Sequence, residues 1–443
     1  MYVFYPGNYR VSTKGFCMRV LWVCNQCIPL VASKLNIECG NKEGWLAGLS
    51  AKLLSKEVKD ITFGICFPYE ADEGKFRAET DIALAYGYSE DSAHPENYNP
   101  LLKKRFREIY ADFKPDVIHI FGTEYGHTLS ACEACDNPEK ILISMQGICD
   151  IYAKAYLNGI PGKVANRSTL RDFLKKDNPR IQKEKFEKRA VNERKAVAIA
   201  GNAAGRTSFD HDFVKEVHPE IKYHVLRETL RSNFYEPVSD LPVKERHSIF
   251  VTQGNYPIKG LHILLEALPK VAEEFPDLKV YVAGDIITGQ QSLKRRILIS
   301  SYGKYIKSLI KKGGLKENIF FTGNITGEEV KKYLLKSEIF CMPSMMENSP
   351  NSLGEAMLLK TPVIASRVGG VPDMIEDRKE GILYEACDAA SLADELINLL
   401  RATDSDSAEL KEMIECAYKR ALINHDGAAN FNAMLDIYGE ICK

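Results

Sequence analysis

The sequence predicts an α/β protein built from two doubly wound domains, in which each parallel sheet is covered by helices on both faces. In both halves of the chain, short and fully apolar runs alternate with helical stretches, which is typical of buried parallel strands. A polar, proline-bearing stretch, 231–247, interrupts this alternation near the middle. The chain has 443 residues, which is too long for one compact core. We therefore expect two domains that face each other across a cleft at the carboxyl edges of their sheets, where ligands of doubly wound folds bind.

The apolar runs mark the strands that we expect. In the first half they are Arg19–Cys24, Ile61–Phe67, Val117–Phe121, Ile141–Met145 and Ala196–Ala200, followed by a last run at Tyr223–Leu226. In the second half they are Ile249–Val251, Lys279–Ala283, Ile319–Thr322, Ile339–Met342 and Pro362–Ala365. Helices such as Leu261–Glu274 join these strands, so the second half repeats the architecture of the first.

These patterns divide the chain into five parts. Residues 1–17 precede the first apolar segment and are expected to be a frayed extension or the product of a misplaced start codon. The first domain covers 18–230, the junction covers 231–247 and the second domain covers 248–406. The last helical segment, 407–443, either packs on the second domain or crosses back to the first.

The composition excludes several classes of protein. Hydrophobic residues make up 45% and charged residues 27%, which excludes a mainly disordered, collagen-like or disulfide-scaffold protein. The net charge of −1 argues against a dedicated nucleic-acid binder. With no long apolar run and no apolar leader, a cytosolic protein is expected. The 12 cysteines are expected to be free thiols, and packing explains the pairs Cys24/Cys27 and Cys132/Cys135 better than a zinc site does.

Two stretches are locally basic. Residues 163–195 contain 12 Lys or Arg against 5 Asp or Glu, and residues 294–312 contain seven basic residues and no acid, interleaved with apolar side chains. Such a mixture either forms solvated outer helix faces or lies on an anionic membrane surface. Peripheral contact with the inner face of a membrane is therefore an alternative to a purely cytosolic location.

The segment from Ile339 to Lys360 is the most informative one. A buried strand ends at Pro343, a loop follows, and the pair Ser349-Pro350 is expected to cap and open a helix. The open amides at the start of that helix favour a diphosphate, because the helix dipole is positive there. Glu355 would project from the same helix to accept hydrogen bonds from ribose hydroxyls, and Glu347 on the loop would meet a sugar. A surface helix with a capping acid is the alternative reading of this segment alone.

A second element follows the first strand of the second half. Gln253 and Gly254 begin a loop that ends in Lys259-Gly260, and glycine lets the backbone approach a ligand closely. Lys259 at a loop-to-helix start is suited to neutralise a departing phosphate. The spacings Asp210/Asp212 and Asp404/Asp406 suggest oxygen ligands for a metal, but a helix dipole with a lysine already supplies counter-charge, so no metal is expected.

The second half resembles the donor-binding domain of the family four retaining glycosyltransferases, which use nucleotide sugars and have the two-Rossmann GT-B fold; some members build bacterial surface polysaccharides. The resemblance implies that Glu347 contacts donor-sugar hydroxyls, Glu355 contacts the ribose, and the backbone near Ile325 contacts the base. The matching motifs are Lys259-Gly260, Ala283-Gly284-Asp285, Phe321-Thr-Gly323-Asn-Ile325, Glu347 to Glu355, Thr361-Pro-Val-Ile-Ala, Gly369-Gly370 and Gly381-Ile-Leu-Tyr384.

The same resemblance implies that the helix start, with Asn351, Ser352 and Leu353, holds the donor diphosphate. In one place the sequence departs from the family pattern. Gln253 stands where many members carry an arginine, and an amide can hydrogen-bond phosphate but brings no charge. Phosphate neutralisation is then expected to depend more on Lys259.

The first half resembles the acceptor side of the same family. The stretch Asn41-Lys-Glu-Gly44-Trp45-Leu resembles the glycine loop that lies near the donor diphosphate. In the stretch from Asp116 to His127, Phe121 stands where some relatives have a histidine. Glu124 or His127 is expected to substitute for it, and both are otherwise ordinary loop residues.

The resemblance implies a transferase that moves a sugar from a nucleoside diphosphate sugar, UDP-linked rather than GDP-linked, to a hydroxyl of a glycan or lipid-linked acceptor. No permanently bound cofactor, metal or nucleic acid is expected. The alternatives are a nucleotide-sugar epimerase or a phosphorylase of the same fold, and a non-catalytic sugar- or lipid-binding subunit. A dehydrogenase is disfavoured, since no Gly-x-Gly-x-x-Gly motif follows the first strand.

Overall fold

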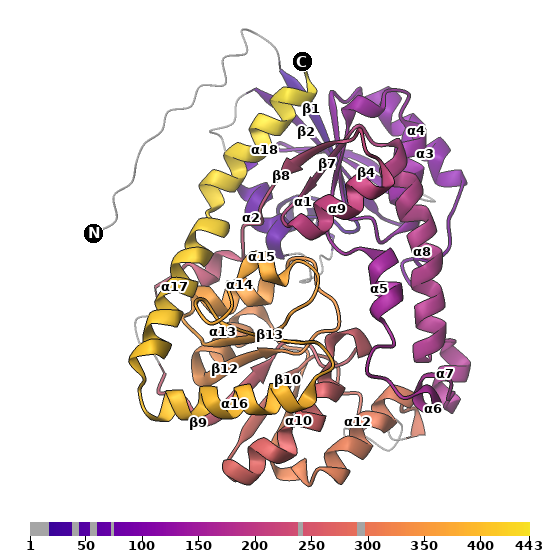
Figure 1. Cartoon of the computed structure of the whole chain (residues 1–443). Coiled ribbons are helices and arrows are strands. Elements are labelled where there is room, and N and C mark those ends of the chain that lie inside the picture. The colour runs from indigo at the N-terminus through magenta and orange to yellow at the C-terminus, as the bar shows by residue number, and fades with distance from the viewer. Residues whose placement is uncertain (1–16, 38–43, 54–59, 72–74, 238–241, 290–296) are drawn as a thin grey trace.

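The computed structural model describes residues 17–37, 44–53, 60–71, 75–237, 242–289 and 297–443. These ranges form two α/β domains, each built on one sheet (Figure 1). The predicted fold class is therefore confirmed.

In the first domain the strand order is β3-β4-β2-β1-β5-β6-β7-β8, and every pairing is parallel except that of β3 with β4. The buried residues of the central strands are mostly apolar, because helices cover both faces of this sheet. The strands are β1 (Met18–Val23), β2 (Ile61–Pro68), β3 (Arg77–Glu79), β4 (Leu84–Tyr88), β5 (Val117–Phe121), β6 (Ile141–Ser144), β7 (Asn202–Gly205) and β8 (Lys222–Val225).

The second domain has a parallel sheet in the order β11-β10-β9-β12-β13-β14. Its first strand begins at Glu245, so the predicted junction, 231–247, ends inside the sheet rather than before it. The strands are β9 (Glu245–Val251), β10 (Lys279–Ala283), β11 (Ile319–Gly323), β12 (Ser337–Met342), β13 (Val363–Ser366) and β14 (Ile382–Tyr384).

Helices connect the strands of both domains. Those of the first domain are α1 (Pro29–Leu35), α2 (Gly44–Leu53), α3 (Leu101–Phe113), α4 (Gly126–Ala134), α5 (Cys149–Ala155), α6 (Gly162–Ala165), α7 (Leu170–Lys175), α8 (Pro179–Ile199) and α9 (Ser208–Val217). Those of the second half are α10 (Leu261–Glu274), α12 (Ser301–Lys312), α13 (Gly327–Lys336), α14 (Asn351–Leu358), α15 (Val371–Met374), α16 (Ala389–Asp404), α17 (Ala408–Asn424) and α18 (Gly427–Ile441).

The predicted strand at Ala196–Ala200 is wrong. These residues end the long helix α8, and the strand β7 starts only at Asn202. Asn178 caps the start of α8 by accepting a hydrogen bond from the amide of Ile181, and the run at its end supplies a buried helical face. A short apolar run fits a buried helix as well as a buried strand, so its periodicity could not decide between them. The short strands β3, β4 and β14 were not predicted.

Two segments cross between the domains. The stretch after α5 in the first domain reaches the second domain, where Tyr156 and Ile160 join its core and the Asn158 carbonyl lies 3.1 Å from Nε2 of His262. In the opposite direction, α17 packs on α14, and α18 returns to the first sheet. The Tyr438 hydroxyl of α18 accepts a hydrogen bond from Nε1 of Trp22 in β1, at 2.9 Å. Each domain therefore contributes to the core of the other.

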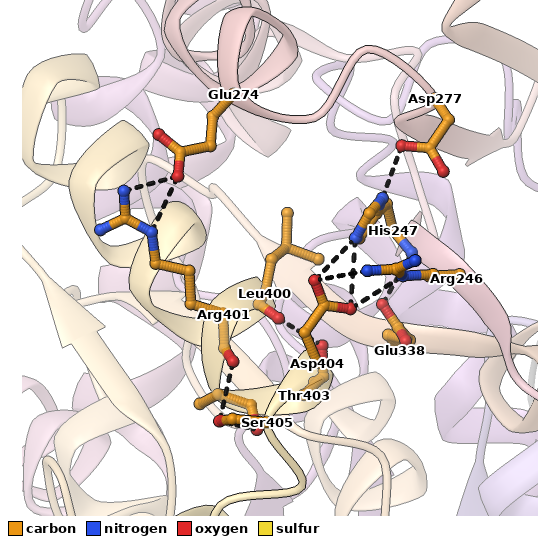
Figure 2. Close-up of polar contacts among 11 residues, drawn as sticks. Arg246, His247, Glu274, Asp277, Glu338, Leu400, Arg401, Thr403, Asp404 and Ser405 are labelled. Carbon is orange, nitrogen blue, oxygen red and sulfur yellow. Dashed lines mark hydrogen bonds and ion pairs between the residues drawn. The ribbon is translucent and has the colours of Figure 1, made fainter.

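A polar cluster ties the end of α16 to the start of β9 (Figure 2). Asp404 receives two hydrogen bonds from the Arg246 guanidinium, both at 3.0 Å, and lies 3.0 Å from Nε2 of His247. Nδ1 of the same imidazole lies 2.5 Å from the Asp277 carboxylate. The backbone amide of His247 donates a hydrogen bond to the Glu338 carboxylate. The Asp404 carboxylate is thus engaged in ion pairs with Arg246 and His247. In the described part of the chain no group of His, Cys, Asp or Glu is arranged as a metal-ligand set.

The cluster makes stability depend on pH. Burial lowers the pKa of His247, but the hydrogen bonds of its ring with Asp404 and Asp277 outweigh burial, so its pKa is raised overall. A raised pKa in the folded state means that the charged ring stabilises the fold fully below its ordinary pKa of about 6.5, and that this stabilisation is lost as the pH rises through the raised value.

We expect His247→Gln to lower the free energy of unfolding most below about pH 6.5 and progressively less at higher pH. Urea unfolding of the variant and the parent across this range measures the difference. His211→Gln is the control, because His211 is an exposed histidine that is also paired with an aspartate. A loss at His247 that does not change with pH would contradict the ionic account.

Candidate functional site

A cavity of about 400 Å³ lies between the two domains. The first domain lines it from the ends of β5 and β6 and from α8, and the second domain lines it with the loop from Glu347 to Asn351. Of the residues predicted for the site, Glu124, Glu347 and Asn351 all lie in this wall. The predicted cleft between the domains is therefore present.

The strand, loop and helix predicted around residue 350 are present as β12 and α14, with one correction. Pro350 rather than Ser349 occupies the cap position, and no side chain caps the helix. Asn351 and Ser352 are the first helical residues, and amides at these positions have no partner inside a helix. Leu353 differs from them, since its amide donates to the Pro350 carbonyl at 3.1 Å and its side chain lies in the core.

In the part of the chain that the structure describes, the side chain of Asn351 has an unsatisfied hydrogen-bond acceptor. Its side-chain oxygen Oδ1 is buried and has no hydrogen-bond partner within the described residues. Buried polar atoms are rarely left without a partner, so this atom is suited to receive a donor from outside the chain.

Lys259 and Glu347 form an ion pair at the cleft. The Lys259 Nζ atom lies 2.7 Å from Oε1 of Glu347, and the Ser344 hydroxyl donates to the same oxygen at 2.7 Å. The carboxylate side chain is 7% exposed and the lysine side chain 24% exposed, so the pair is only partly accessible to water. The sequence predicted both residues for the site but not their contact with each other.

Three glycines allow the loop that carries Glu347 to lie close to its neighbours. Gly260 has a φ of +70°, and a Cβ atom there would lie 1.6 Å from the Pro343 carbonyl oxygen. Gly369 has a φ of +50°, and its Cβ would lie 2.0 Å from the Glu347 carbonyl oxygen. The amide of Gly370 donates to this same carbonyl at 3.2 Å. The glycine motifs thus set the position of Glu347.

Glu355 lies deeper than predicted. It is 2% exposed, and its Oε1 accepts hydrogen bonds from the Arg231 guanidinium at 2.9 and 2.8 Å. Burial raises the pKa of Glu355 to about 7, although Arg231 favours the charged form. The sequence placed Arg231 in the domain junction and gave it no role, because its partner is 124 residues away.

Asn348 connects the two domains. Its side-chain amide donates to Asp210 and to the Gln146 carbonyl, both at 3.0 Å, and its oxygen accepts from the Thr207 hydroxyl at 2.9 Å. Asn348 is 3% exposed, so these bonds are shielded from water. Asp210 therefore serves as a hydrogen-bond acceptor in this contact. This clamp, next to Glu347 in sequence, was not predicted.

Aromatic and charged side chains of the first domain line the opposite wall, and most of them were not predicted. The Arg189 guanidinium lies over the Phe186 ring at 4.5 Å and donates to the Glu124 carbonyl at 2.7 Å. The Glu124 carboxylate accepts hydrogen bonds from the amides of Thr123 and Gly147 at 2.9 and 2.6 Å. The basic run 163–195 contained Arg189, but its sequence gave no reason to choose it over its neighbours.

A buried acid supports this wall from behind. Glu193 in α8 is fully buried and accepts hydrogen bonds from the Thr123 hydroxyl at 2.5 Å and from the amides of Cys149 and Asp150 at 3.0 Å. Burial raises the pKa of Glu193 to about 7, against the effect of these bonds. The loop that carries Glu124 is thereby tied to the start of α5.

The remaining predicted residues lie as follows. His127 is fully buried; its Nδ1 lies 2.6 Å from Glu90, and it is not part of the described cleft wall. Gln253 is exposed, whereas Gly254 is buried against Val282. Ile325 packs on the edge of the second-domain core. Gly44 is the first residue of α2, and residues 41–43 of its motif lie outside the described ranges.

Arg206 is a further cation in the cleft wall. It pairs with Glu228 at 2.6 Å, and both side chains are 7% exposed. Burial raises the pKa of Glu228, although Arg206 favours its ionised form. Nothing in the sequence pointed to Glu228, because its role depends on this pair with a residue 22 positions away.

We expect Gly260→Ala to destabilise the protein more than Gly314→Ala does. Both glycines have φ 70° and ψ 15°, but only Gly260 has a carbonyl in the space that a methyl group would take. The backbone strain should cost about 1–2 kcal/mol at either position, and the collision at Gly260 a further 1–3 kcal/mol or so. Urea unfolding of both variants gives the comparison, and equal losses would contradict the close-packed turn.

Comparison with known proteins finds similarity mainly in the second domain. Residues 233–420 match the family described as glycosyl transferases group 1. The chain is 28% identical over 191 residues to the phosphatidyl-myo-inositol mannosyltransferase of Mycobacterium leprae, and 25% identical over 186 residues to a putative colanic acid biosynthesis glycosyltransferase of Escherichia coli. These segments cover 43% and 40% of this chain and 45% and 42% of the relatives, so less than half of each relative is spanned.

Solved structures match nearly the whole chain. Sucrose-phosphate synthase from Thermosynechococcus elongatus aligns with a TM-score of 0.67 at 15% identity, over 96% of this chain and 98% of that one. Anabaena HepE in complex with UDP-glucose aligns with a TM-score of 0.62 at 16% identity, over 95% and 98%. Identities this low establish the fold alone. The resemblance noted from the motifs is confirmed: the chain has the two-domain GT-B fold, and its residues 233–420 match the family model of the group 1 glycosyl transferases.

Proposed function

We propose that this protein transfers a hexosyl or related sugar from a nucleoside diphosphate sugar to an acceptor hydroxyl, with retention at the anomeric carbon. The observation that carries the proposal is the Lys259–Glu347 ion pair at the cleft, next to the uncapped start of α14. This arrangement brings a cation, a helix dipole and a carboxylate together from two loops, which matches the needs of a sugar joined to a diphosphate. HepE, which shares the fold, was solved with UDP-glucose, and this favours a UDP-linked donor.

In the proposed complex, the diphosphate binds the amides of Asn351 and Ser352. Glu347 accepts hydrogen bonds from the sugar hydroxyls, and the Arg231–Glu355 pair binds the ribose. The base is placed near Ile325. Counter-charge comes from Lys259 and the helix dipole without a metal ion.

The reaction that we propose breaks the bond between the anomeric carbon and the β-phosphate oxygen while the acceptor oxygen bonds to the same face of that carbon. The acceptor proton passes to the departing phosphate oxygen, so no enzyme nucleophile is required. Lys259 opposes the negative charge that builds on the phosphate. The acceptor binds at the first-domain wall, where Tyr125, Tyr152 and Phe186 offer stacking surfaces beside Glu124. The Asn348 clamp keeps the domains closed and limits hydrolysis by water.

Lys259→Met should lower kcat about 100- to 1000-fold, since it removes the cation that faces the leaving phosphate. Because Lys259 and Glu347 are in direct contact, the double variant with Glu347→Gln should be no slower than about the worse single variant. Steady-state release of nucleoside diphosphate, with and without acceptor, measures both. Strictly additive losses would show that the two residues act separately. A change confined to KM would instead assign Lys259 to uniform binding of the donor.

Glu355→Gln tests the ribose contact through pH. The ionised carboxylate is the better acceptor for ribose hydroxyls, and its pKa of about 7 lies within the assay range. We expect kcat/KM for the donor to rise as the pH passes through about 7 in the parent, because kcat/KM reports groups of the free enzyme. In Glu355→Gln this rise should be absent and kcat/KM lower by about tenfold at pH 8. If the variant keeps the pH profile of the parent, Glu355 does not contact the donor.

Acceptor-dependent release of nucleoside diphosphate separates this proposal from its alternatives. An epimerase releases its product without an acceptor, a phosphorylase releases no nucleotide, and a non-catalytic subunit releases nothing.

A further inference from the structure

The short helix α7 exposes three large apolar side chains at one end of the first domain. Leu170, Phe173 and Leu174 are 57%, 73% and 66% exposed. Apolar side chains that gather on a surface in this way mark an interaction site more often than single exposed ones do.

The orientation of α7 is fixed, so the exposure of these side chains is built into the structure. Thr169 and Asp172 form a capping box at its start. The Asp172 carboxylate is fully buried and accepts hydrogen bonds from the amide of Thr169 at 3.0 Å and from the amide of Ser301 in α12 at 2.8 Å. Because Asp172 points inward, residues 170, 173 and 174 are held outward.

The exposed charged side chains of the stretch 163–180 have one sign. Neither of the two acids between residues 163 and 180 is fully exposed. Asp172 is buried, and Asp177 is half-buried and paired with Arg171 at 2.9 Å. Every exposed charged side chain in this stretch is basic, namely Lys163, Arg167, Lys175, Lys176 and Arg180.

The neighbouring helix α12 adds to this surface. It lies beside α6 and α7 (Figure 1) and buries Tyr302, Ile306 and Ile310 in the second-domain core. All its charged residues are lysines and all are exposed, namely Lys304, Lys307, Lys311 and Lys312. The net charge of the whole chain is −1, so this concentration of positive charge is local.

We propose that α7 and the basic side chains around it form a docking surface for an anionic lipid bilayer. The apolar side chains would enter the headgroup region, and the lysines and arginines would contact the anionic headgroups. The combination favours a membrane over the other anionic partner, nucleic acid, which would pair with the lysines but leave Phe173 and Leu174 in water. In the described ranges no helix is long and apolar enough to cross a bilayer, so attachment there would be at the surface.

The place of this surface relative to the cleft supports the proposal, and this step rests on the proposed function. α8 begins at Pro179, directly after α7, and its residues Phe186 and Arg189 line the cleft. At a rise of 1.5 Å per residue they lie about 10 and 15 Å along the helix from its start. A bilayer at α7 would hold a lipid-linked acceptor within reach of the first-domain wall.

Vesicle sedimentation tests the docking surface without reference to activity. The full chain should sediment with phosphatidylcholine vesicles that contain phosphatidylglycerol and not with vesicles of phosphatidylcholine alone, and high salt should reduce the bound fraction. The double variant Phe173→Glu, Leu174→Glu should bind at least about tenfold more weakly. Both side chains are exposed, so the melting temperature should not change.

Ile423→Glu is the matched control, because Ile423 on α17 is 66% exposed, as Leu174 is. It should leave vesicle binding unchanged. Equal binding by the parent and the α7 variant, equal loss in the control, or binding to nucleic acid or a protein in place of anionic vesicles would overturn the proposal. Transfer to a water-soluble acceptor should be unaffected in the α7 variant, so a failed docking test leaves the proposed function standing and a failed transfer assay leaves the docking surface standing.

Discussion

The site depends on the close approach of one loop to its neighbours. The stretch between β12 and α14 lies against Gly260 on one side and Gly369 on the other, where carbonyl oxygens occupy the space of a missing side chain. This contact brings Lys259, at the end of the turn before Gly260, to within 2.7 Å of Glu347. Any side chain at either glycine would push the loop away, and the ion pair and the uncapped start of α14 would move with it.

Three acids in or near the elements that form the cleft wall are hard to ionise because they are buried. The pKa values of Glu193, Glu228 and Glu355 are all raised, mainly by burial. Two of the three have a guanidinium as partner, and the third accepts amide and hydroxyl hydrogen bonds. A buried charge without such partners would cost several kcal/mol or so. In the proposed function the arginines have two effects. They hold the acids in place, and their positive charge reduces the repulsion between these acids and a donor diphosphate.

The two domains are bound together at more places than a single junction. The segment after α5 contributes to the core of the second domain, and α18 contributes Tyr438 to the core of the first. At the cleft, Asn348 bonds to three groups of the first domain. The crossings lie on opposite sides of the molecule (Figure 1). An opening motion that admits substrates would therefore break the few polar bonds of the clamp while the apolar crossings hold.

The sequence alone determined the architecture and the local motifs, because these follow from short-range patterns. Apolar runs located most strands within one or two residues, and the glycine turns and the strand, loop and helix around residue 350 are local features. Apolar periodicity could not separate the end of α8 from a strand. Only the tertiary structure decided which polar side chains meet: Arg231 with Glu355, Arg206 with Glu228, and Asn348 with Asp210, pairs that lie 124, 22 and 138 residues apart. Their energies depend on burial and distance, which are set only when the chain has folded and, for Asn348 and Asp210, when the two domains have come together.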